Sequence, residues 1–377
     1  MRYKLSDLFE LQMGKTPSRN NPNYWNSNDY SWVSISDMSS YDKYVSGTKE
    51  YISEQAVKES RIKTIPANTV IMSFKLSIGK TAITTGPIFS NEAIMAFIDK
   101  KTIAIDPEYI FYLFSGKDWD EGSNKAVMGK TLNKATLSNI EVDIPSLDIQ
   151  KERIENLNKI SILISDKKQQ LNQLDELIKA RFVELFGDGF ETTELRNICK
   201  TTSGGTPSTK NPDYYKGTIP WVTTTALGPN HIDGTKAKAY ISEEAVANSA
   251  TKIIPSGSIL FGIRVGVGKT SINDVDICTN QDIVAIMDVN ETKFSKLFIK
   301  HVLDANRAHY DSLKKGATIL GITSDDLKNT PIPLAQIKAQ KDFETFVEQV
   351  DKSKFAVQKS LEKTQLLFDS LMQEYFG

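Results

Sequence analysis

The chain has 377 residues, of which 40% are apolar, and its 46 Lys and Arg nearly balance its 47 Asp and Glu. This length suits two domains with buried cores, and the composition argues against a disordered chain. The first residues lack the apolar core of a signal peptide, and no run approaches the ~20 apolar residues that cross a bilayer. Because Cys199 and Cys278 form no CxxC pair, we expect a soluble, cytoplasmic protein.

The first 145 residues are rich in Thr, Ser, Gly, Asn and Pro, and short β-branched runs lie between their turn signals. This pattern predicts a mostly β globular domain with a few helices. We expect strands at 70–74 and 94–98 and helices at 53–60 and 107–115.

A long helix is predicted next, because residues 147–186 contain neither Gly nor Pro and follow the pair Ile144-Pro145. A second β-rich region follows, with expected strands at 258–261 and 283–286 and an expected helix at 295–305. Residues 334–376 again lack Gly and Pro, follow Ile332-Pro333, and predict a second long helix.

Apolar residues recur every seven positions in both long helices, with a few polar interruptions, as in a coiled coil. A solvated surface helix is the weaker alternative, because the apolar rows are regular. Chain connectivity predicts that the two helices run antiparallel and hold the globular domains apart. The predicted seam residues are Leu157, Ile164, Leu171, Ile178, Leu185, Val347, Val350, Val357, Leu361, Phe368 and Leu371.

The sequence repeats itself at an offset of 189 to 190 residues, which indicates a tandem duplication. The fold class predicted from it is α+β, with two tandem pseudo-repeated mostly β domains separated by two long antiparallel coiled-coil helices. Matching segments are Thr16-Pro17-Ser18 with Thr206-Pro207-Ser208, Trp32-Val33 with Trp221-Val222, Gly79-Lys80-Thr81 with Gly268-Lys269-Thr270, and Phe186-Gly187 with Phe376-Gly377.

Several segments of the chain are characteristic of one family. They are Ser203-Gly204-Gly205-Thr206-Pro207-Ser208, Tyr214-Tyr215, Ile219-Pro220-Trp221-Val222, the hairpin-like segment from Phe261 to Thr270, Thr279-Asn280-Gln281, and Gln150 and Gln340 near the helix starts. With these segments the chain resembles the specificity subunit of type I restriction–modification systems, in the family's order of recognition domain, helix, recognition domain, helix. The first copy departs from the second at Lys15, which replaces a glycine, and at Ser77, which replaces the first glycine of a Gly-x-Gly turn.

The resemblance implies two target recognition domains, at 1–145 and 189–333, that each read one half of a bipartite, asymmetric DNA sequence. The helices at 146–188 and 334–377 would set the unread spacer and dock methyltransferase subunits, two of them by the pseudo-two-fold symmetry. Restriction and translocase subunits would join for cleavage. S-adenosylmethionine, ATP and Mg²⁺ would then belong to the partner subunits, and this chain would be non-catalytic.

Candidate DNA contacts are loop residues that can donate hydrogen bonds to phosphates or base edges. Arg264 is the best candidate for reading guanine, although a surface arginine beside a strand is an equal alternative. Trp32 and Trp221 are better explained as core anchors than as stacking platforms. The candidates are Lys15, Thr16, Ser18, Lys75, Lys80, Lys130, Thr206, Ser208, Lys210, Arg264, Lys269, Lys314 and Lys315.

Two motifs point weakly to other chemistry. Gly79-Lys80-Thr81 and its repeat resemble the end of a P-loop, but Phe74 and Ile263 occupy the position of the required first glycine. The turn either presents Lys80 and Lys269 to a DNA backbone or is purely structural. Asn-Pro-x-Tyr at 21–24 and 211–214 resembles an amino-methyltransferase motif, but the third residue is wrong and Asn-Pro is itself a turn signal.

The sequence alone leaves two rival functions open. The net charge of −1 favours a DNA-independent, protein-binding scaffold, because DNA-binding domains are usually basic. A modification enzyme with a degenerate motif is the other rival. The three histidines lie apart from Cys or carboxylate clusters, so the sequence predicts no metal site and no catalytic residue.

Overall fold

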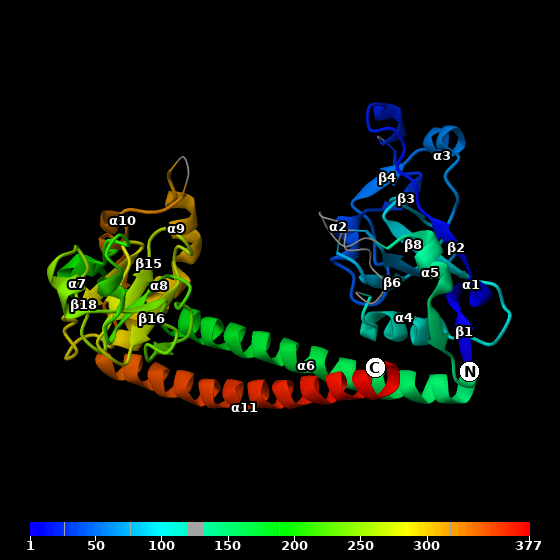
Figure 1. Ribbon diagram of the computed structural model, residues 1–377. Coiled ribbons are helices and arrows are strands. Elements are labelled where there is room, and N and C mark those ends of the chain that lie inside the picture. Colours follow the sequence, from blue (N-terminus) through cyan, green and yellow to red (C-terminus); the bar gives the residue numbers. More distant parts are fainter. Residues whose placement is uncertain (26, 76, 120–131, 188, 317–318) are drawn as a thin grey trace. The chain divides into compact units, whose positions relative to one another are not determined.

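The computed structural model describes residues 1–25, 27–75, 77–119, 132–187, 189–316 and 319–377. The chain forms two compact units. The first consists of Met1–Lys168 and Lys359–Gly377, and the second of Gln169–Gln358. Each unit therefore combines a globular part with a portion of both long helices (Figure 1).

The first globular part is built on three small sheets, and its strands include the two predicted from β-branched runs. The central sheet is antiparallel, in the order β2-β8-β5-β6. Its strands are β2 (Phe9–Met13), β8 (Ile94–Asp99), β5 (Val70–Ser73) and β6 (Thr81–Ile83). The other sheets are β4 (Glu50–Ile52), β3 (Tyr30–Val33) and β7 (Phe89–Ser90), and β1 (Arg2–Lys4) with β9 (Glu141–Asp143).

The second globular part repeats this topology. The orders are β11-β18-β15-β16-β13, β14-β12-β17 and β10-β19, and the pairing of β13 with β16 corresponds to an isolated bridge between Tyr44 and Ile83 in the first unit. The duplication seen in sequence is thus a duplication of fold. The strands are β10 (Thr192–Glu194), β11 (Lys200–Ser203), β12 (Ile219–Val222), β13 (His231–Ile232), β14 (Ala239–Ile241), β15 (Ile259–Gly262), β16 (Thr270–Asn273), β17 (Cys278–Thr279), β18 (Ile283–Met287) and β19 (Pro331–Pro333).

Short helices begin at capping residues that recur in both units. Ser53 caps α3 and Ser242 caps α7, each accepting a hydrogen bond from the amide three residues later. The sequence predicted three of the short helices, which are α3, α4 and α8, and missed the others. The helices are α1 (Leu5–Leu8), α2 (Ile35–Met38), α3 (Glu54–Ser60), α4 (Pro107–Gly116), α5 (Lys134–Asn139), α7 (Glu243–Ala247), α8 (Lys296–Ala305), α9 (Arg307–Leu313) and α10 (Ser324–Lys328), with 3-10 turns η1 (Pro22–Tyr24), η2 (Leu195–Asn197) and η3 (Pro212–Tyr215).

The long helices are α6 (Leu147–Phe186) and α11 (Ile337–Phe376), of 40 residues each. Helix α11 begins three residues later than predicted, because the Leu334 amide continues the pairing of β19 by donating to the Glu191 carbonyl. In the first unit, Arg153 near the start of α6 donates to the Tyr375 carbonyl near the end of α11. In the second unit, Asp175 of α6 pairs with Lys354 of α11 at 2.6 Å. Each contact indicates an antiparallel helix pair.

One largely buried helix in each unit lies between the sheet and the long helices (Figure 1). In the first unit this is α4, whose Tyr109 and Tyr112 rings contact Phe376 and Phe368 of α11. In the second unit it is α8, whose Phe298 contacts Phe182 and Phe186 of α6. The apolar ends of the long helices are therefore part of the cores.

A buried glutamine fastens the start of each long helix to its globular part. Gln150 accepts from the Asp106 amide and donates to the carbonyls of Ala104 and Pro145, and its side chain is fully buried. Gln340 repeats all three contacts with Ser295, Lys293 and Ala335. Because buried polar groups need partners, these amides fix how each helix leaves its domain.

Candidate nucleic-acid interface

The turns after β5 and β15 share positive φ angles at two equivalent positions. Gly266 and Gly268 have φ of 72° and 80°, and Ser77 and Gly79 have φ of 47° and 90°. Ser77 thus adopts the left-handed conformation of the glycine that it replaces, at a cost of about 1 kcal/mol. The two lysines that follow differ, because Lys80 donates to the Ser39 hydroxyl whereas Lys269 lines a cavity.

Arg264, the predicted guanine reader, lies on the second turn and pairs with Asp282 at 2.6 Å. Its side chain also packs where a Cβ on Gly321 would stand, at 2.7 Å from Cγ. Gly321 bridges Lys315, so the structure brings two of the predicted DNA contacts to one end of this domain. A base that bound Arg264 would have to share it with, or take it from, the Asp282 carboxylate.

The Thr-Pro-Ser segments lie at the same place in both units. The Thr16 hydroxyl donates to Glu92, and the Thr206 hydroxyl donates to the equivalent Gln281 at 2.5 Å. The Trp32 and Trp221 indoles each donate to a carbonyl of the same loop, that of Lys15 or Gly205, and both are buried. These tryptophans are core anchors, as the sequence indicated.

The remaining predicted contacts are scattered cations and hydroxyls. Lys15 donates to the Ser60 carbonyl at 2.6 Å, Lys75 lies over the Phe74 ring, and Lys314 pairs with Asp311 at 2.5 Å. Ser18, Ser208 and Lys210 are exposed. Lys130 lies outside the described residues.

Two arginines that sequence reasoning missed lie beside predicted contacts. Arg19 stacks over Trp25 at 3.7 Å and forms a bidentate pair with Glu50. Arg307, at the start of α9, packs against Gly268 of the second turn. The position of Arg19 beside Ser18 was a usable signal, whereas Arg307 is brought to the turn only by the fold.

The predicted seam residues differ in burial. Leu157 and Ile164 in the first unit, and Ile178, Val347 and Val350 in the second, are buried. The others are partly buried, and they are Leu171, Leu185, Val357, Leu361, Phe368 and Leu371.

The motifs suggestive of catalysis have structural roles. The side chains of Asn21 and Asn211 cap the 3-10 turns that follow them, so Asn-Pro marks a turn.

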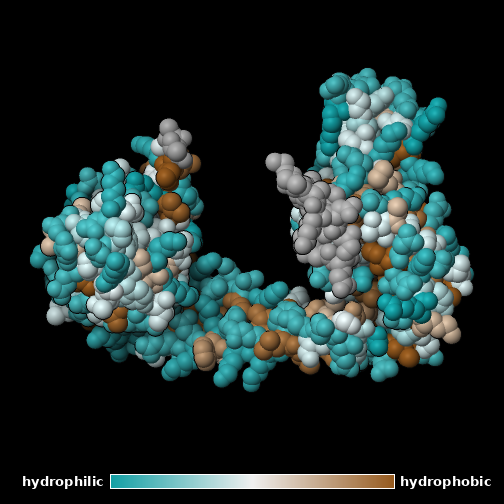
Figure 2. Space-filling view, viewed as in Figure 1, coloured by the Kyte–Doolittle hydropathy of each residue, from teal (hydrophilic) through white to brown (hydrophobic). Residues whose placement is uncertain are grey.

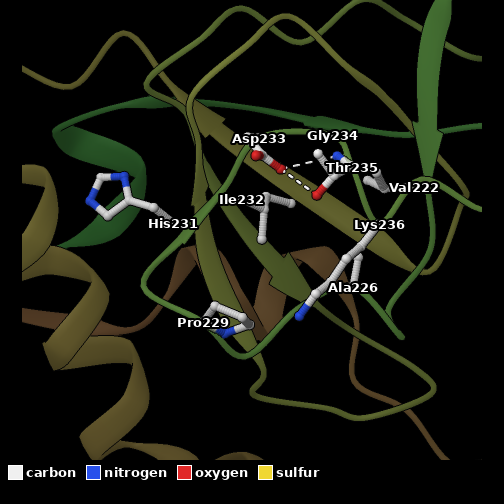
Figure 3. Close-up of a pocket in the computed structure, with 9 residues that line it drawn as sticks. All are labelled: Val222, Ala226, Pro229, His231, Ile232, Asp233, Gly234, Thr235 and Lys236. Atoms are coloured by element: carbon white, nitrogen blue, oxygen red, sulfur yellow. Dashed lines mark hydrogen bonds between the residues drawn. The ribbon is translucent and has the colours of Figure 1, made fainter. Parts of the chain in front are cut away.

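Figure 3 shows a small pocket of the second unit, in which Asp233 accepts two hydrogen bonds from Thr235 while His231 points away. His231 pairs with Asp274 instead, at 2.7 Å. Within the described ranges, no three His, Cys, Asp or Glu side chains could hold a metal ion, and no helix there could span a bilayer.

Curated relatives of this chain include type I restriction enzyme specificity subunits. The type I restriction enzyme MjaIX specificity subunit of Methanocaldococcus jannaschii is 27% identical over 285 residues, which are 68% of this chain and 64% of the relative. The EcoR124I/EcoR124II specificity subunit of Escherichia coli is 27% identical over 265 residues, 64% of this chain and 62% of the relative. The chain thus spans less than two thirds of the length of these relatives.

Two solved structures share the fold over the whole chain. One is described as the structural basis of complex assembly and conformational transition of the type I R-M system. It matches with a TM-score of 0.62 at 16% identity, over 100% of this chain and 97% of the solved chain. The S subunit from M. genitalium matches with a TM-score of 0.53 at 12% identity and covers 100% and 96%. The family described as type I restriction modification DNA specificity domain matches residues 1–176 and again 187–366. The chain therefore belongs to this family and carries two copies of its domain.

Proposed function

We propose that this chain is the non-catalytic DNA-specificity subunit of a type I restriction–modification complex, and that each globular domain reads one half of a bipartite, asymmetric duplex target. The observation that carries the proposal is the duplication of one domain fold within a family named for DNA specificity. Two copies of one fold with different loop side chains suit two different half-sites. The near-neutral net charge is compatible with this role, because partner subunits can supply phosphate contacts.

The long helices would set the distance between the two half-sites. Each has 40 residues without Gly or Pro, which is about 60 Å of helix at 1.5 Å per residue. Half-sites on one face of B-DNA lie about 34 Å apart or a little more. The Gln150 and Gln340 contacts support a fixed angle between each helix and its domain, which a ruler requires.

Exposed apolar residues on the long helices would dock the methyltransferase subunits. In the first unit these include Ile162 and Leu366, and in the second Val183 and Phe355, with exposures between 60% and 71%. Figure 2 shows apolar surface along the helices. Such surface favours protein contact. In this scheme S-adenosylmethionine, ATP and Mg²⁺ bind to the partner subunits, which carry out methylation and cleavage.

Methylation mapping tests the proposal. A DNA library is incubated with this chain and its methyltransferase partner, with each protein alone as the control. We expect methylation at a bipartite motif with a fixed gap, only when both proteins are present. Methylation that ignores this chain, with a stable complex, would favour the protein-binding scaffold, and methyl transfer by this chain alone would favour an enzyme.

A further inference from the structure

A cavity of about 650 Å³ lies in the second unit between the helix pair, α8 and the turn after β15. Its lining includes five cationic residues and two carboxylates. The carboxylates already have cationic partners, because Asp175 pairs with Lys354 at 2.6 Å and Asp304 pairs with Lys300 at 2.8 Å. The lining is therefore cationic after its internal pairs are taken into account.

The cations without an internal carboxylate partner in the cavity are Lys179, Lys269 and Arg307. Lys179 is exposed and pairs with Glu176 on its own helix. Lys269 and Arg307 form no ion pair within 4.0 Å among the described residues, and both lie at the turn that contains Gly268. Neither side chain is held in a close ion pair, so both can bind an anion, although the charge of Arg307 also acts on Asp311 of the same helix.

A half-buried imidazole supplies a second, independent observation. His301 lines the same cavity, and its Nε2 atom is shielded from solvent and has no hydrogen-bond partner among the described residues. The ring is wedged against Phe182 and Phe343. Burial, with help from Lys300 and Lys354, lowers the pKa of His301 to about 4. A buried polar atom without a partner is costly, and a rotation of the ring that turned Nε2 toward the cavity would let a ligand atom become its partner.

The first unit does not offer the same lining. The residue one repeat before His301 is Tyr112, whose ring contacts Phe368 and whose hydroxyl donates to Asn158 at 2.6 Å. Lys43 beside it is already held by Glu108 at 2.9 Å. The polar groups at this place in the first unit are partners of one another. In the second unit, His301 Nε2 has no hydrogen-bond partner among the described residues.

We propose that this cavity of the second unit binds an oxyanion of the phosphate class through Lys269, Arg307 and His301 Nε2. The guanidinium and the ammonium would donate charge-assisted hydrogen bonds, and the imidazole would donate from Nε2. The phosphate could belong to a DNA backbone or to a free phosphate compound. The first source rests on the proposed function, and the second does not.

The three histidines of the full chain make the site measurable by NMR of the imidazole Cε1–H groups. His301→Gln identifies the resonance of His301. The full chain is titrated with inorganic phosphate, with a short non-specific duplex, and with chloride at matched ionic strength. We expect a saturable shift of the His301 signal with phosphate and a higher pKa for His301 in its presence, because a bound anion stabilises the imidazolium.

Lys269→Gln and Arg307→Gln should each weaken phosphate binding roughly tenfold, the effect of losing one charge-assisted hydrogen bond. Lys338→Gln, which removes an exposed cation of α11 outside the cavity lining, is the matched control and should change nothing. A duplex that shifts His301 and competes with phosphate identifies the backbone as the source. A phosphate response without a duplex response at His301 identifies a free phosphate compound.

The inference is overturned if phosphate and duplex leave the His301 signal unchanged, or if chloride shifts it equally. It is also overturned if both cavity variants bind phosphate as the unaltered chain does. If no duplex bound to the assembled complex, the proposed function would be contradicted. The phosphate titration would still test whether the cavity binds an oxyanion. The two failures are therefore distinguishable.

Discussion

Replacing Gln340 by methionine should destabilise the second unit much more than the small change in side-chain volume suggests. The side chain is fully buried and makes hydrogen bonds of 2.8, 3.0 and 2.8 Å to Ser295, Lys293 and Ala335. Methionine fills nearly the same volume, so packing changes little. One amide and two carbonyls lose their partner, and at about 1–3 kcal/mol for each buried unsatisfied group, the lower end of the range still gives about 3 kcal/mol.

Hydrogen exchange read on the segment around Ser295 measures this effect locally. The Ser295 amide donates to Gln340 Oε1, so Gln340→Met should speed its exchange by a factor of about 100, which corresponds to roughly 3 kcal/mol. The melting temperature should fall as well. Gln349→Met, at an exposed position of the same helix, is the control and should leave both unchanged. Equal exchange in the two variants would refute the view that this amide fastens α11 to its domain.

Four further results are expected. Inserting or deleting one heptad in both long helices changes their length by about 10 Å, so methylation mapping should give the same half-sites with a different gap, and an unchanged gap would contradict the ruler. Arg264→Ala should cost about 1–3 kcal/mol at one base pair of one half-site, whereas uniform weakening across sequences would indicate a phosphate contact. The pKa of His301 is lowered from 6.5 to about 4, so as the pH falls the unfolded chain takes up the proton before the folded chain does. The free energy of unfolding, measured with urea, should therefore fall by as much as about 3 kcal/mol between pH 6.5 and pH 4. A His301→Gln variant should lose less over the same pH range. Ser77→Gly should raise the free energy of unfolding by up to about 1 kcal/mol in the same assay. An unchanged value would show that Ser77 holds its φ of 47° without strain.

The parts of the fold that were predictable depend on local or periodic signals. Helix α6 has the predicted bounds, because 40 residues without Gly or Pro follow an Ile-Pro pair. Strands β5 and β8 follow from β-branched runs, and the repeat predicts that the second unit copies the first. The start of α11 was placed three residues early, because pairing between Leu334 and Glu191 cannot be read from either segment alone.

The partners of the candidate site residues were not predictable, because they come from distant segments. Nothing near Arg264 in sequence indicates that Asp282 pairs with it, and Lys15 meets Ser60 only through the fold. Arg307 stands beside the Gly268 turn because α8 and α9 carry it there. Composition and spacing identified loops that could face DNA, and the structure added which of their charges are already paired.

The division of the chain into units bears on the order of its synthesis and folding. The second unit is a single stretch, Gln169–Gln358, whereas the first needs Lys359–Gly377 to complete it. During translation the first globular part is made first, but Phe368, Leu371, Met372, Tyr375 and Phe376 pack against its core only after the second unit has emerged from the ribosome. The usual order, in which the N-terminal domain is finished first, is therefore reversed. Until then, the surface that these side chains cover is a place for chaperones to bind and for nascent chains to aggregate.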